Sequence, residues 1–566
     1  MGMAAIQSRA RSEAFRQQLV DLLMELCRTD TTPQADVSLA AKAERQVFDI
    51  VRREFEHCCL PQARVEFVPI APAIEQHPFF SRLYYTMTPE RPEGLSVREC
   101  YRDRANLLLL VDGDGSGAGV DQAVNVHVDV VKPYVPPRLE GGKVFGRGAC
   151  DDKGSLAAFL GALGLIGHYL HTTGRRLARD LTAMVVIEEE TGGNGSLSLA
   201  LDSRLKQRYQ SLMVLECCGN RVYPGNRGAL WYKVVAKAAG VPMNLLAAAA
   251  FIIEELEKEG RAIKAESRHP LFPHRPVQTC HGVIGPFGEH PSRICGRVDL
   301  EIGLPVTTSV RLLVADVLES AVAEYTGLYG DKTRALDSAG RPKVARHYDL
   351  TDTPRGLLVC VHGSTGHMGS ILENDGAITK MATMVRALVR SRSAIESAGG
   401  GPMCLALHGW QDPAHLTMEG GQGFLPTHDM PQIMDRLRRA VLRGSETYLR
   451  EARLDGAVRA SDCFAVAYEK LHNAAFAGDP ESPDVRHAAD AARLAGTWVD
   501  GPVLGWDSSC DARIFACEYP GLPVLTAGPG LLAHAHSDQE QIAIDDLVKS
   551  AEFLAYFILK QMGMIE

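Results

Sequence analysis

Several features that would assign the chain to a protein class are missing from its 566 residues. There is no long run of Lys and Arg, and the formal net charge is −9 at pH 7, which disfavours a nucleic-acid partner. The most apolar long stretch, LLAAAAFII from Leu245, is too short to span a bilayer, and the first residues contain no apolar signal-peptide core. We therefore expect a soluble protein that contacts neither nucleic acid nor membrane.

The sequence also lacks the short motifs of several enzyme classes. The glycine-rich stretch GDGSGAG at residues 113–119 does not have the G-x-G-x-x-G spacing of dinucleotide-binding proteins, and there is no G-x-x-x-x-G-K-S/T phosphate loop. An H-E-x-x-H zinc helix and a G-x-S-x-G nucleophile turn are absent too. These absences argue against a nucleotide enzyme, a helix-based zinc protease and a serine hydrolase.

Fourteen cysteines are present, and they do not follow zinc-ribbon spacing. Two pairs are adjacent in sequence, Cys58–Cys59 and Cys217–Cys218. In a long chain, scattered cysteines of this kind are typical of reduced, buried thiols in an intracellular protein. We expect a cytoplasmic protein without a disulfide framework.

Strand-like and helix-like segments alternate in the first 230 residues. A helix is predicted at residues 12–28, because its leucines fall on one face. Short apolar runs typical of buried strands are NLLLLV, AVNVHV, AMVVI and LMVL, and the helical run KGSLAAFLGALGLIGHYL lies between the second and the third. This alternation predicts an α/β fold with a mostly parallel sheet, in which ligands bind beyond the carboxyl ends of the strands.

A different pattern begins after about residue 230. The stretches 229–326 and 356–452 each read as strand, glycine turn, helix, glycine-rich strand segment and helix. They predict an α+β insert at 229–470, built either from two repeats of about a hundred residues or from two unrelated stretches. Because the α/β pattern returns with GLPVLTAGPG, we expect one domain made of 1–228 and 471–566, interrupted by this insert.

Acidic and histidine side chains gather at the ends of the predicted strands. They are His127 and Asp129 after AVNV, Glu188, Glu189 and Glu190 after AMVVI, Glu216 after SLMVL, and His534 and His536 after GLPVL. Asp129 shares a strand face with His127 and can orient it, as carboxylates do behind metal-bound imidazoles. Three adjacent carboxylates repel one another unless a cation compensates them or they are solvated. Mixtures of His and carboxylate suit zinc and similar ions, so a metal site is one interpretation and a solvated acidic loop is the other.

The turn GRGACDDKGS at residues 146–155 places Asp151 and Asp152 just before an apolar helical run. Carboxylates at a helix N-terminus are stabilised by the helix dipole, by about 0.3–1 kcal/mol each. That effect explains the pair without any ligand, so a metal-binding role for it depends on the neighbouring motifs.

Six motifs occur in one order along the chain: HVDVV, GRGACDDKG, EEETGG, LE before GNRG, SSCDARIF and AHSDQE. In this set the sequence resembles the dinuclear zinc metallopeptidase family of carnosinase, PepV-type dipeptidase, aminoacylase, acetylornithine deacetylase and succinyl-diaminopimelate desuccinylase. The resemblance runs from His127 to Glu540 and, with the TDTTP segment, covers nearly the whole chain. It implies a phosphorylase/hydrolase-like catalytic domain interrupted by a lid domain of the dimerisation type.

The resemblance also implies roles for individual residues. One metal would be held by His127, Asp151 and Glu216, and the other by Asp151, Glu190 and His536. Asp151 would bridge the two metals and be followed by a cis peptide bond, while Asp152 would be a turn residue that points elsewhere. Glu189 would be the general base, and Asp129 would lie behind His127. The implied cofactors are two divalent metal ions, zinc in the first place, with manganese or cobalt as alternatives.

In the resembling family, a histidine of the lid domain meets the developing oxyanion, and in the common homodimers it comes from the partner subunit. The first insert unit has KAAGVPMN where such a histidine is expected, and the second has GSTGHMGS with His367. The resemblance to the large lid of PepV-type dipeptidases predicts a monomer with an internal pseudo-dimer, in which His367 serves its own chain. A histidine of the turn is the alternative role for His367.

For two motifs, neighbouring residues of the same type leave open which of them matches the family pattern. The triplet EEE leaves the base and the ligand ambiguous by one position, and the pair Glu189 and Glu190 is chosen because it directly precedes TGG. His536 is preferred over His534 for its distance from Glu540.

Three further assignments rest on residue chemistry. Cys217 is an alternative metal ligand to Glu216, since thiolates bind zinc well. Gly528, Pro529 and Gly530 are expected to bring backbone amides to the carboxylate of the substrate. Asp511 and Arg513 of the CDARIF motif are expected to be structural.

The leading hypothesis is a metal-dependent hydrolase that cleaves the amide bonds of small peptides, as a dipeptidase or a carboxypeptidase. Glu189 would take a proton from water and deliver it to the leaving amine. An N-acyl-amino-acid deacylase is the alternative with the same chemistry, and a non-catalytic metal-dependent binding protein is the alternative from another class. The presence of Glu189 and of every expected ligand favours an enzyme, while the insert shows no clear arginine for a substrate carboxylate.

Overall fold

The computed structural model divides the chain into two compact units. Unit 1 contains Met1–Arg227, Pro270–Phe272 and Leu471–Glu566, and unit 2 contains Gly228–His269 and Pro273–Lys470. The structure describes residues 2–289, 291, 293–334, 336, 342–364, 366–367, 375–468, 472–537 and 539–565.

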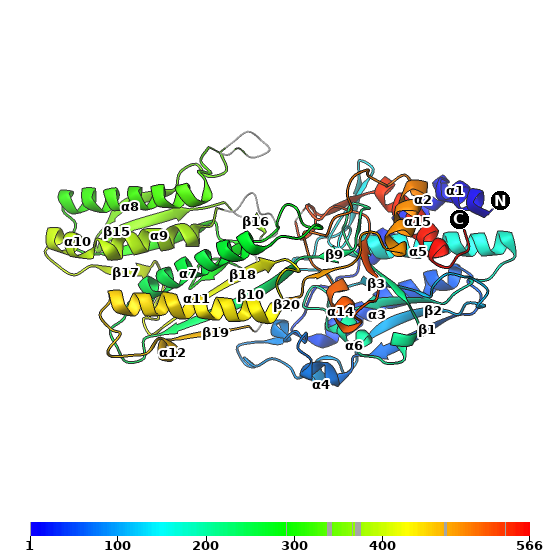
Figure 1. Ribbon diagram of the computed structural model, residues 1–566, viewed down its shortest axis with the longest axis horizontal. Coiled ribbons are helices and arrows are strands. Elements are labelled where there is room, and N and C mark those ends of the chain that lie inside the picture. Colours follow the sequence, from blue (N-terminus) through cyan, green and yellow to red (C-terminus); the bar gives the residue numbers. More distant parts are fainter. Residues whose placement is uncertain are drawn as a thin grey trace. The chain divides into compact units, whose positions relative to one another are not determined.

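Unit 1 is built on a seven-stranded sheet (Figure 1). In sheet order the strands are β1 (Ala63–Pro69), β2 (Ala105–Val111), β6 (Leu181–Val186), β3 (Gln122–His127), β7 (Ser211–Leu215), β22 (Val524–Ala527) and β8 (Val222–Tyr223). The four central strands β6, β3, β7 and β22 pair in parallel, and the outer pairings are antiparallel. The predicted α/β class is confirmed, and the antiparallel edges are an addition that the sequence did not indicate.

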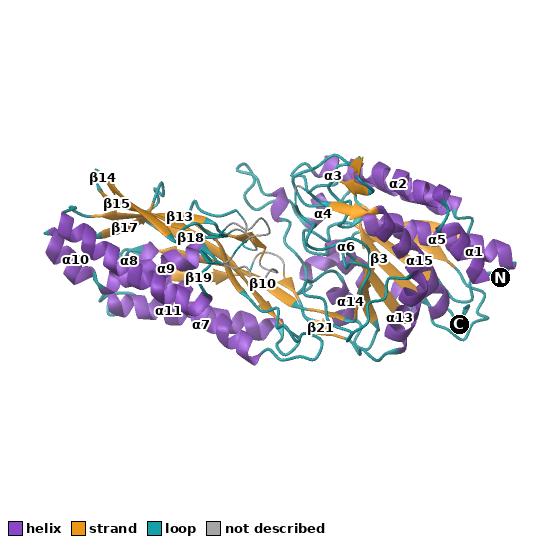
Figure 2. Cartoon of the chain, turned by 90° about the horizontal axis from the view of Figure 1, so that it is seen from above, coloured by secondary structure: helices purple, strands orange, loops and turns teal. Residues whose placement is uncertain are grey.

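Helices cover both faces of this sheet (Figure 2). The helices of unit 1 are α1 (Gly2–Ala10), α2 (Glu13–Cys27), α3 (Val37–His57), α4 (Val97–Cys100), α5 (Lys153–Thr173), α6 (Asn194–Ala200), α13 (Pro483–Ala495), α14 (Ala512–Glu518) and α15 (Ile544–Gln561). Helices α5 and α15 pack together on one face, whereas α6 and α14 pack on the other. Because both faces are covered, every residue of β3, β6 and β7 is buried, which explains their continuous apolar sequences.

Shorter elements complete unit 1. They are the sheet of β4 (Arg138–Glu140), β5 (Lys143–Phe145) and β23 (Gln541–Ala543), the pair of β9 (Gly225–Asn226) and β21 (Phe476–Ala477), and the 3-10 turns at Pro72–Gln76, Tyr84–Thr86 and Leu205–Gln207. The pairing of β5 with β23 brings the C-terminal segment beside the turn that carries Asp151. Among the described residues, one helix, α5, is long and apolar enough to cross a membrane, and 83% of that stretch is buried inside the protein.

Unit 2 contributes four strands to each of two sheets. The strands are β10 (Gly228–Lys237), β11 (Thr279–Ile284), β18 (His415–Phe424) and β19 (Phe464–Ala467) in one sheet, and β13 (Arg297–Gly303), β14 (Tyr348–Thr353), β15 (Gly356–His362) and β17 (Cys404–Leu407) in the other. A short pair is formed by β12 (Arg293–Ile294) and β16 (Gly366–His367). The helices are α7 (Leu245–Glu266), α8 (Thr308–Tyr329), α9 (Ala377–Arg390), α10 (Arg392–Gly399), α11 (Met430–Glu451) and α12 (Ala460–Cys463). The four long helices α7, α8, α9 and α11 lie on one side of the strands (Figure 2).

Both sheets of unit 2 have the same topology. The order is β11-β18-β10-β19 in one and β14-β15-β13-β17 in the other, so each places its second, third, first and fourth strands side by side in antiparallel pairs. Apart from the short elements β12, β16 and α10, the tandem stretches 229–326 and 356–452 both follow the order strand, helix, two strands, helix. However, each sheet combines strands of both stretches, and the second sheet is inserted between β11 and β18 of the first. The repeat in sequence is therefore not the unit that folds into one sheet.

Candidate functional site

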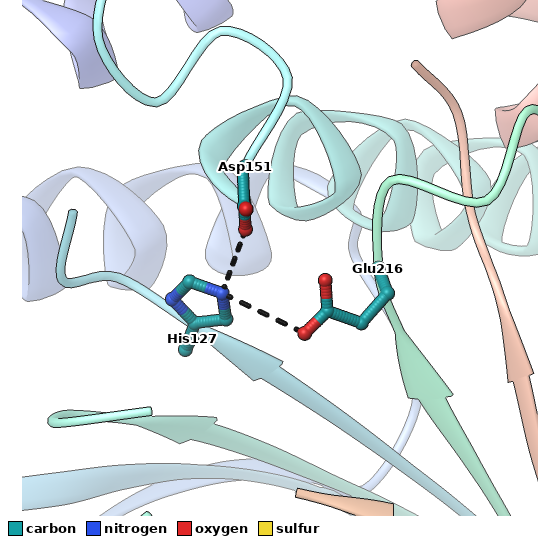
Figure 3. A group of neighbouring side chains, drawn as sticks. All are labelled: His127, Asp151 and Glu216. Atoms are coloured by element: carbon teal, nitrogen blue, oxygen red, sulfur yellow. Dashed lines mark hydrogen bonds and ion pairs between the residues drawn. The ribbon is translucent and has the colours of Figure 1, made fainter. Parts of the chain in front are cut away.

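The ends of three parallel strands and one turn carry most of the predicted residues. Figure 3 shows three of these residues, His127, Asp151 and Glu216. His127 is the last residue of β3, Glu216 follows β7, and the triplet that starts at Glu188 follows β6. Asp151 belongs to the turn that leads into α5. The carboxyl ends of neighbouring parallel strands meet at one edge of the sheet, so residues far apart in sequence share one site.

The first group of side chains consists of His127, Asp151 and Glu216. The Nε2 atom of His127 lies 3.2 Å from Asp151 Oδ1 and 3.9 Å from Glu216 Oε1 (Figure 3). All three residues are at least 94% buried. One candidate ligand atom from each lies within 4.8 Å of the others, a spacing that suits one ion.

The second group consists of Asp151, Glu190 and His536. The Nε2 atom of His536 lies 3.2 Å from Asp151 Oδ2 and 3.1 Å from Glu190 Oε1. Asp151 thus turns one carboxylate oxygen to each histidine, the geometry expected of a residue shared by two ions. The side chain of His536 is 42% exposed, so this group is open to solvent, unlike the first.

The turn that carries Asp151 is held by a buried glutamate. Glu540 Oε1 accepts hydrogen bonds from the backbone N–H groups of Gly148, Cys150 and Asp151, at 2.9, 3.0 and 3.1 Å. Arg147 donates to the same carboxylate. The peptide bond between Asp151 and Asp152 is cis, as the family resemblance implied.

Asp129 contacts both His127 and the turn that carries Glu189 and Glu190. Its backbone carbonyl lies 3.0 Å from Nδ1 of His127, and its Oδ1 lies 3.5 Å from the same nitrogen. Its carboxylate oxygens accept the backbone N–H groups of Glu189 and Glu190, at 3.1 and 3.0 Å. The expected position behind His127 is therefore found, and the sequence did not indicate that Asp129 also holds the glutamate turn.

The three consecutive glutamates point in different directions. Glu190 contacts His536, and Glu188 points into the protein interior, where it pairs with Arg104. Glu189 lies between them, half-buried. Burial and the neighbouring Asp511 raise its pKa well above its usual value, an effect that His127 opposes.

The charges of the site call for cations. Burial, followed by the neighbouring Asp151, raises the pKa of Glu216, and burial raises that of Glu190 against the opposing effect of His536. Within the described part of the chain, neither a lysine nor an arginine pairs with Asp151, Glu189, Glu190 or Glu216. Buried carboxylates without a cationic side chain are costly unless a metal compensates them. The donor set of two imidazoles and three carboxylates fits two divalent ions.

Gly528 and Gly530 pack against the backbone that carries the first group. A Cβ atom at Gly528 would lie 2.3 Å from the carbonyl oxygen of Glu216, and one at Gly530 would lie 2.7 Å from Cys150 Sγ. Their own carbonyl groups accept the N–H groups of Asn220 and Gly219. This close approach explains why both positions are glycine on either side of Pro529.

Three other predicted residues have different outcomes. Cys217 Sγ lies 3.9 Å from Asp151 Oδ2, and hydrogen bonding to Cys150 and burial raise the pKa of its thiol. Cys217 is in neither group of candidate ligand atoms found among the described residues. His534 is in neither group of ligand atoms found among the described residues. The backbone of His367 belongs to β16, and its side chain lies outside the described residues.

The residues around Glu188 could not be predicted from the sequence. Arg104, Tyr85 and Tyr101 all contact its carboxylate. Tyr85 lies in a short 3-10 turn, Tyr101 directly follows α4 and Arg104 directly precedes β2, so none of them belongs to a segment with hydrophobic periodicity that points to the site. No spacing rule connects residues 84 or more positions apart on such segments, so single-sequence reasoning had no signal to use.

Comparisons with known proteins support these observations. The sequence profile of peptidase family M20/M25/M40 matches residues 123–560. A peptidase M20 domain-containing protein of Schizosaccharomyces pombe is 28% identical over 148 residues, and this match spans 25% of the present chain and 36% of that protein.

Two solved structures share the fold over the full length. Human carnosine dipeptidase 1 superposes with a TM-score of 0.55 at 12% identity, covering 99% of this chain and 98% of that one. The di-peptidase Dug1p of Saccharomyces cerevisiae superposes with a TM-score of 0.54 at 14% identity, covering 100% and 99% of the two chains.

Proposed function

Because the chain belongs to peptidase family M20/M25/M40 and is a metal-dependent amide hydrolase, we propose that it cleaves small peptides as a dipeptidase or carboxypeptidase. The observation that carries this proposal is the position of Asp151, whose two carboxylate oxygens each lie 3.2 Å from a different histidine. Two divalent cations at such a site, when bound, lower the pKa of a shared water molecule and polarise the scissile carbonyl.

The proposal assigns each candidate ligand residue to one or both of the two cations. His127 and Glu216 hold one cation, Glu190 and His536 hold the other, and Asp151 contacts both. Zinc suits this mixture of imidazole and carboxylate, with manganese and cobalt as alternatives. Asp129 keeps the ring of His127 oriented through Nδ1, as outer-sphere partners of metal-bound histidines do.

Glu189 is the proposed general base. Its backbone N–H donates to Asp129, and no ion pair fixes its carboxylate in the described part of the chain. It takes a proton from the attacking water and delivers it to the amine that leaves. A positioned carboxylate of this kind contributes about 10²- to 10⁴-fold to the rate.

Two further residues belong to the proposal. His367, placed at the end of β16, is proposed to meet the developing oxyanion. The backbone N–H groups of Gly528 and Gly530 are proposed to meet the carboxylate of the substrate, and Pro529, which has no N–H, shapes the turn between them.

We also propose that the enzyme works as a cytoplasmic monomer. All fourteen cysteines are free, which suits a reducing compartment. The two sheets of equal topology in unit 2 are the proposed internal counterpart of a two-subunit lid.

The test is a substrate panel. Purified wild-type protein and the Glu189→Ala variant are assayed with dipeptides, C-terminally blocked dipeptides, and N-acetyl and N-succinyl amino acids. The proposal predicts hydrolysis of free dipeptides, with kcat at least about 100-fold lower in the variant. Preference for N-acyl amino acids would instead make the enzyme a deacylase. Absence of any hydrolysis by the metal-loaded wild type would favour a metal-dependent binding protein.

A further inference from the structure

The first glutamate of the triplet is tied into a buried network. Glu188 is only 2% exposed, and Arg104 Nη1 donates to its Oε1 at 2.6 Å. The hydroxyl groups of Tyr85 and Tyr101 donate to the same carboxylate, one to each oxygen. Hydrogen bonds to an ionised carboxylate are about twice as strong as those between neutral groups, so three of them define one position for this side chain.

Arg104 is itself fixed from the other side. Its Nε lies 3.0 and 3.1 Å from the two carboxylate oxygens of Glu44, and its Nη2 lies 2.6 Å from Glu44 Oε1. Its Nη1 also donates to the hydroxyl oxygen of Tyr85 at 2.8 Å. Glu44 belongs to α3, so the network connects the glutamate turn to a long helix of unit 1.

The backbone of this turn needs such support. Glu188 has a φ angle of +66°, a left-handed conformation that costs a residue with a side chain about 1–2 kcal/mol. Its carbonyl oxygen accepts the N–H of Gly193 at 2.6 Å. On the opposite side, Asp129 accepts the N–H groups of Glu189 and Glu190. The turn is therefore held through its side chain at one residue and through its backbone at the next two.

We propose that Arg104, Tyr85 and Tyr101 are positioning residues that act through Glu188 to aim the carboxylate of Glu189 at the attacking water. This inference rests on the proposed function, because it takes Glu189 as the general base. The direction in which the Glu189 side chain leaves the turn depends on the backbone angles of the preceding residue, Glu188. These angles are fixed because the Glu188 side chain is held in one position. A small displacement of a catalytic group is enough to lower a rate about 100-fold.

The first test removes single hydroxyl groups. Tyr85→Phe and Tyr101→Phe each delete one hydrogen bond to Glu188 and keep the aromatic ring. The matched control is Tyr556→Phe, because Tyr556 is also buried in unit 1 and donates to a glutamate, Glu552, at 3.0 Å on α15. The variants at 85 and 101 are expected to lower kcat about 10- to 100-fold with KM and bound metal within twofold of wild type. The melting temperature is expected to fall by a similar amount in all three variants, and only the control, Tyr556→Phe, is expected to keep the kcat of the wild type.

A double-mutant cycle then asks whether the effect passes through Glu189. Tyr101→Phe is combined with Glu189→Ala, and the residual hydrolysis is measured at saturating metal. If the network acts by aiming Glu189, Tyr101→Phe changes the residual rate less than about twofold once that carboxylate is gone.

Two results would overturn the inference while the proposed function stands. They are an unchanged kcat in the Tyr85→Phe/Tyr101→Phe double variant, or an equal loss from Tyr101→Phe with and without Glu189. A metal-loaded wild type that hydrolyses no amide substrate would instead overturn the proposed function, and the inference with it.

Discussion

At the scale of single residues, the site is defined as much by what holds the ligands as by the ligands themselves. Asp151 can face two histidines only because its turn is fixed by Glu540, which comes from the segment just after His536. The buried carboxylate of Glu540 thus connects Asp151, which belongs to both groups, with the loop that carries His536, a candidate ligand of the second group.

This arrangement predicts the effect of Glu540→Gln. The amide has one acceptor oxygen in place of a carboxylate, and its NH₂ group faces N–H donors, so the turn loosens around Asp151. Removing such an outer-sphere partner lowers metal affinity about 10- to 100-fold, which calorimetric titration with zinc would measure. Glu552→Gln, a buried glutamate on α15, serves as the control and should bind zinc as the wild type does. Equal affinities in all three proteins would contradict the account.

From the sequence, the candidate residues that stand at strand ends could be predicted to lie together. His127 and Glu216 follow continuous apolar runs, and the rule that parallel strands end at one edge brings them together. The contact between Arg104 and Glu188 could not be predicted, because it joins residues 84 positions apart through loops whose path depends on the whole of unit 1. The dual role of Asp129 was missed for the same reason, since its second contact is to the backbone of another strand end.

At the scale of elements, helix α5 shows how tightly the support of the site is packed. It begins directly after Asp151 and Asp152, and the carbonyl oxygen of Cys58 approaches its Gly167 so closely that a Cβ there would lie at 2.1 Å. At Gly164 of the same helix a Cβ would have no neighbour within 4 Å.

These two glycines form a matched pair for a stability experiment. Gly167→Ala should lower the free energy of unfolding by about 1–3 kcal/mol, because backbone must move to admit the methyl group. Gly164→Ala should raise it by up to about 1 kcal/mol, since alanine favours a helix and nothing obstructs it. Urea denaturation of both variants checks the prediction, and a loss of stability at Gly164 as large as at Gly167 would contradict it.

In unit 2, a buried carboxylate joins four elements. Glu257 on α7 accepts the hydroxyl of Tyr329 on α8 at 2.7 Å and that of Thr379 on α9 at 3.2 Å. His281 Nε2 on β11 lies 3.2 Å from the same carboxylate, and Arg261 lies at 4.0 Å. Burial opposes ionisation, but these partners hold the pKa of Glu257 below its usual value of 4.5.

A lowered carboxyl pKa predicts a pH-dependent stability. Glu257 stabilises the folded state at pH values above about 4.5, and this contribution is lost as the pH falls towards its lower folded-state pKa. Glu257→Gln should therefore cost more stability at pH 7 than at pH 3.5, as measured by urea unfolding of the full chain at both values. An equal cost at the two pH values would show that the charge of Glu257 does not contribute.

At the scale of the whole molecule, the tandem pattern of unit 2 was visible in the sequence, but its assembly was not. Apart from the short β12, β16 and α10, strand, helix, two strands and helix occur twice in order. However, β18 pairs with β10 and β11 of the first stretch, and β13 pairs with β15 and β17 of the second. A repeat in sequence specifies which elements form. Which of the two sheets a strand joins depends on the sheet edge at which its apolar face becomes buried. This burial involves residues far away in sequence, so local sequence patterns do not reveal it.

The proposed internal duplication of unit 2 predicts that the protein does not need a second chain. Sedimentation equilibrium at micromolar concentration should give a mass near 61.5 kDa, that of one chain. Activity per chain should not change on dilution, because the proposed monomer takes no residue of its site from a partner. A mass of two chains, with activity that falls on dilution, would contradict the monomer.

The central claim is that Asp151 is shared by two metal ions, and metal counting in three proteins tests it most directly. Wild type, His536→Ala and Asp151→Asn are purified in parallel, equilibrated with zinc at a fixed free concentration and analysed for zinc per chain. The account predicts two ions in the wild type, one in His536→Ala, and fewer than one in Asp151→Asn, because that residue serves both groups. One ion in the wild type, or equal losses in the two variants, would contradict it.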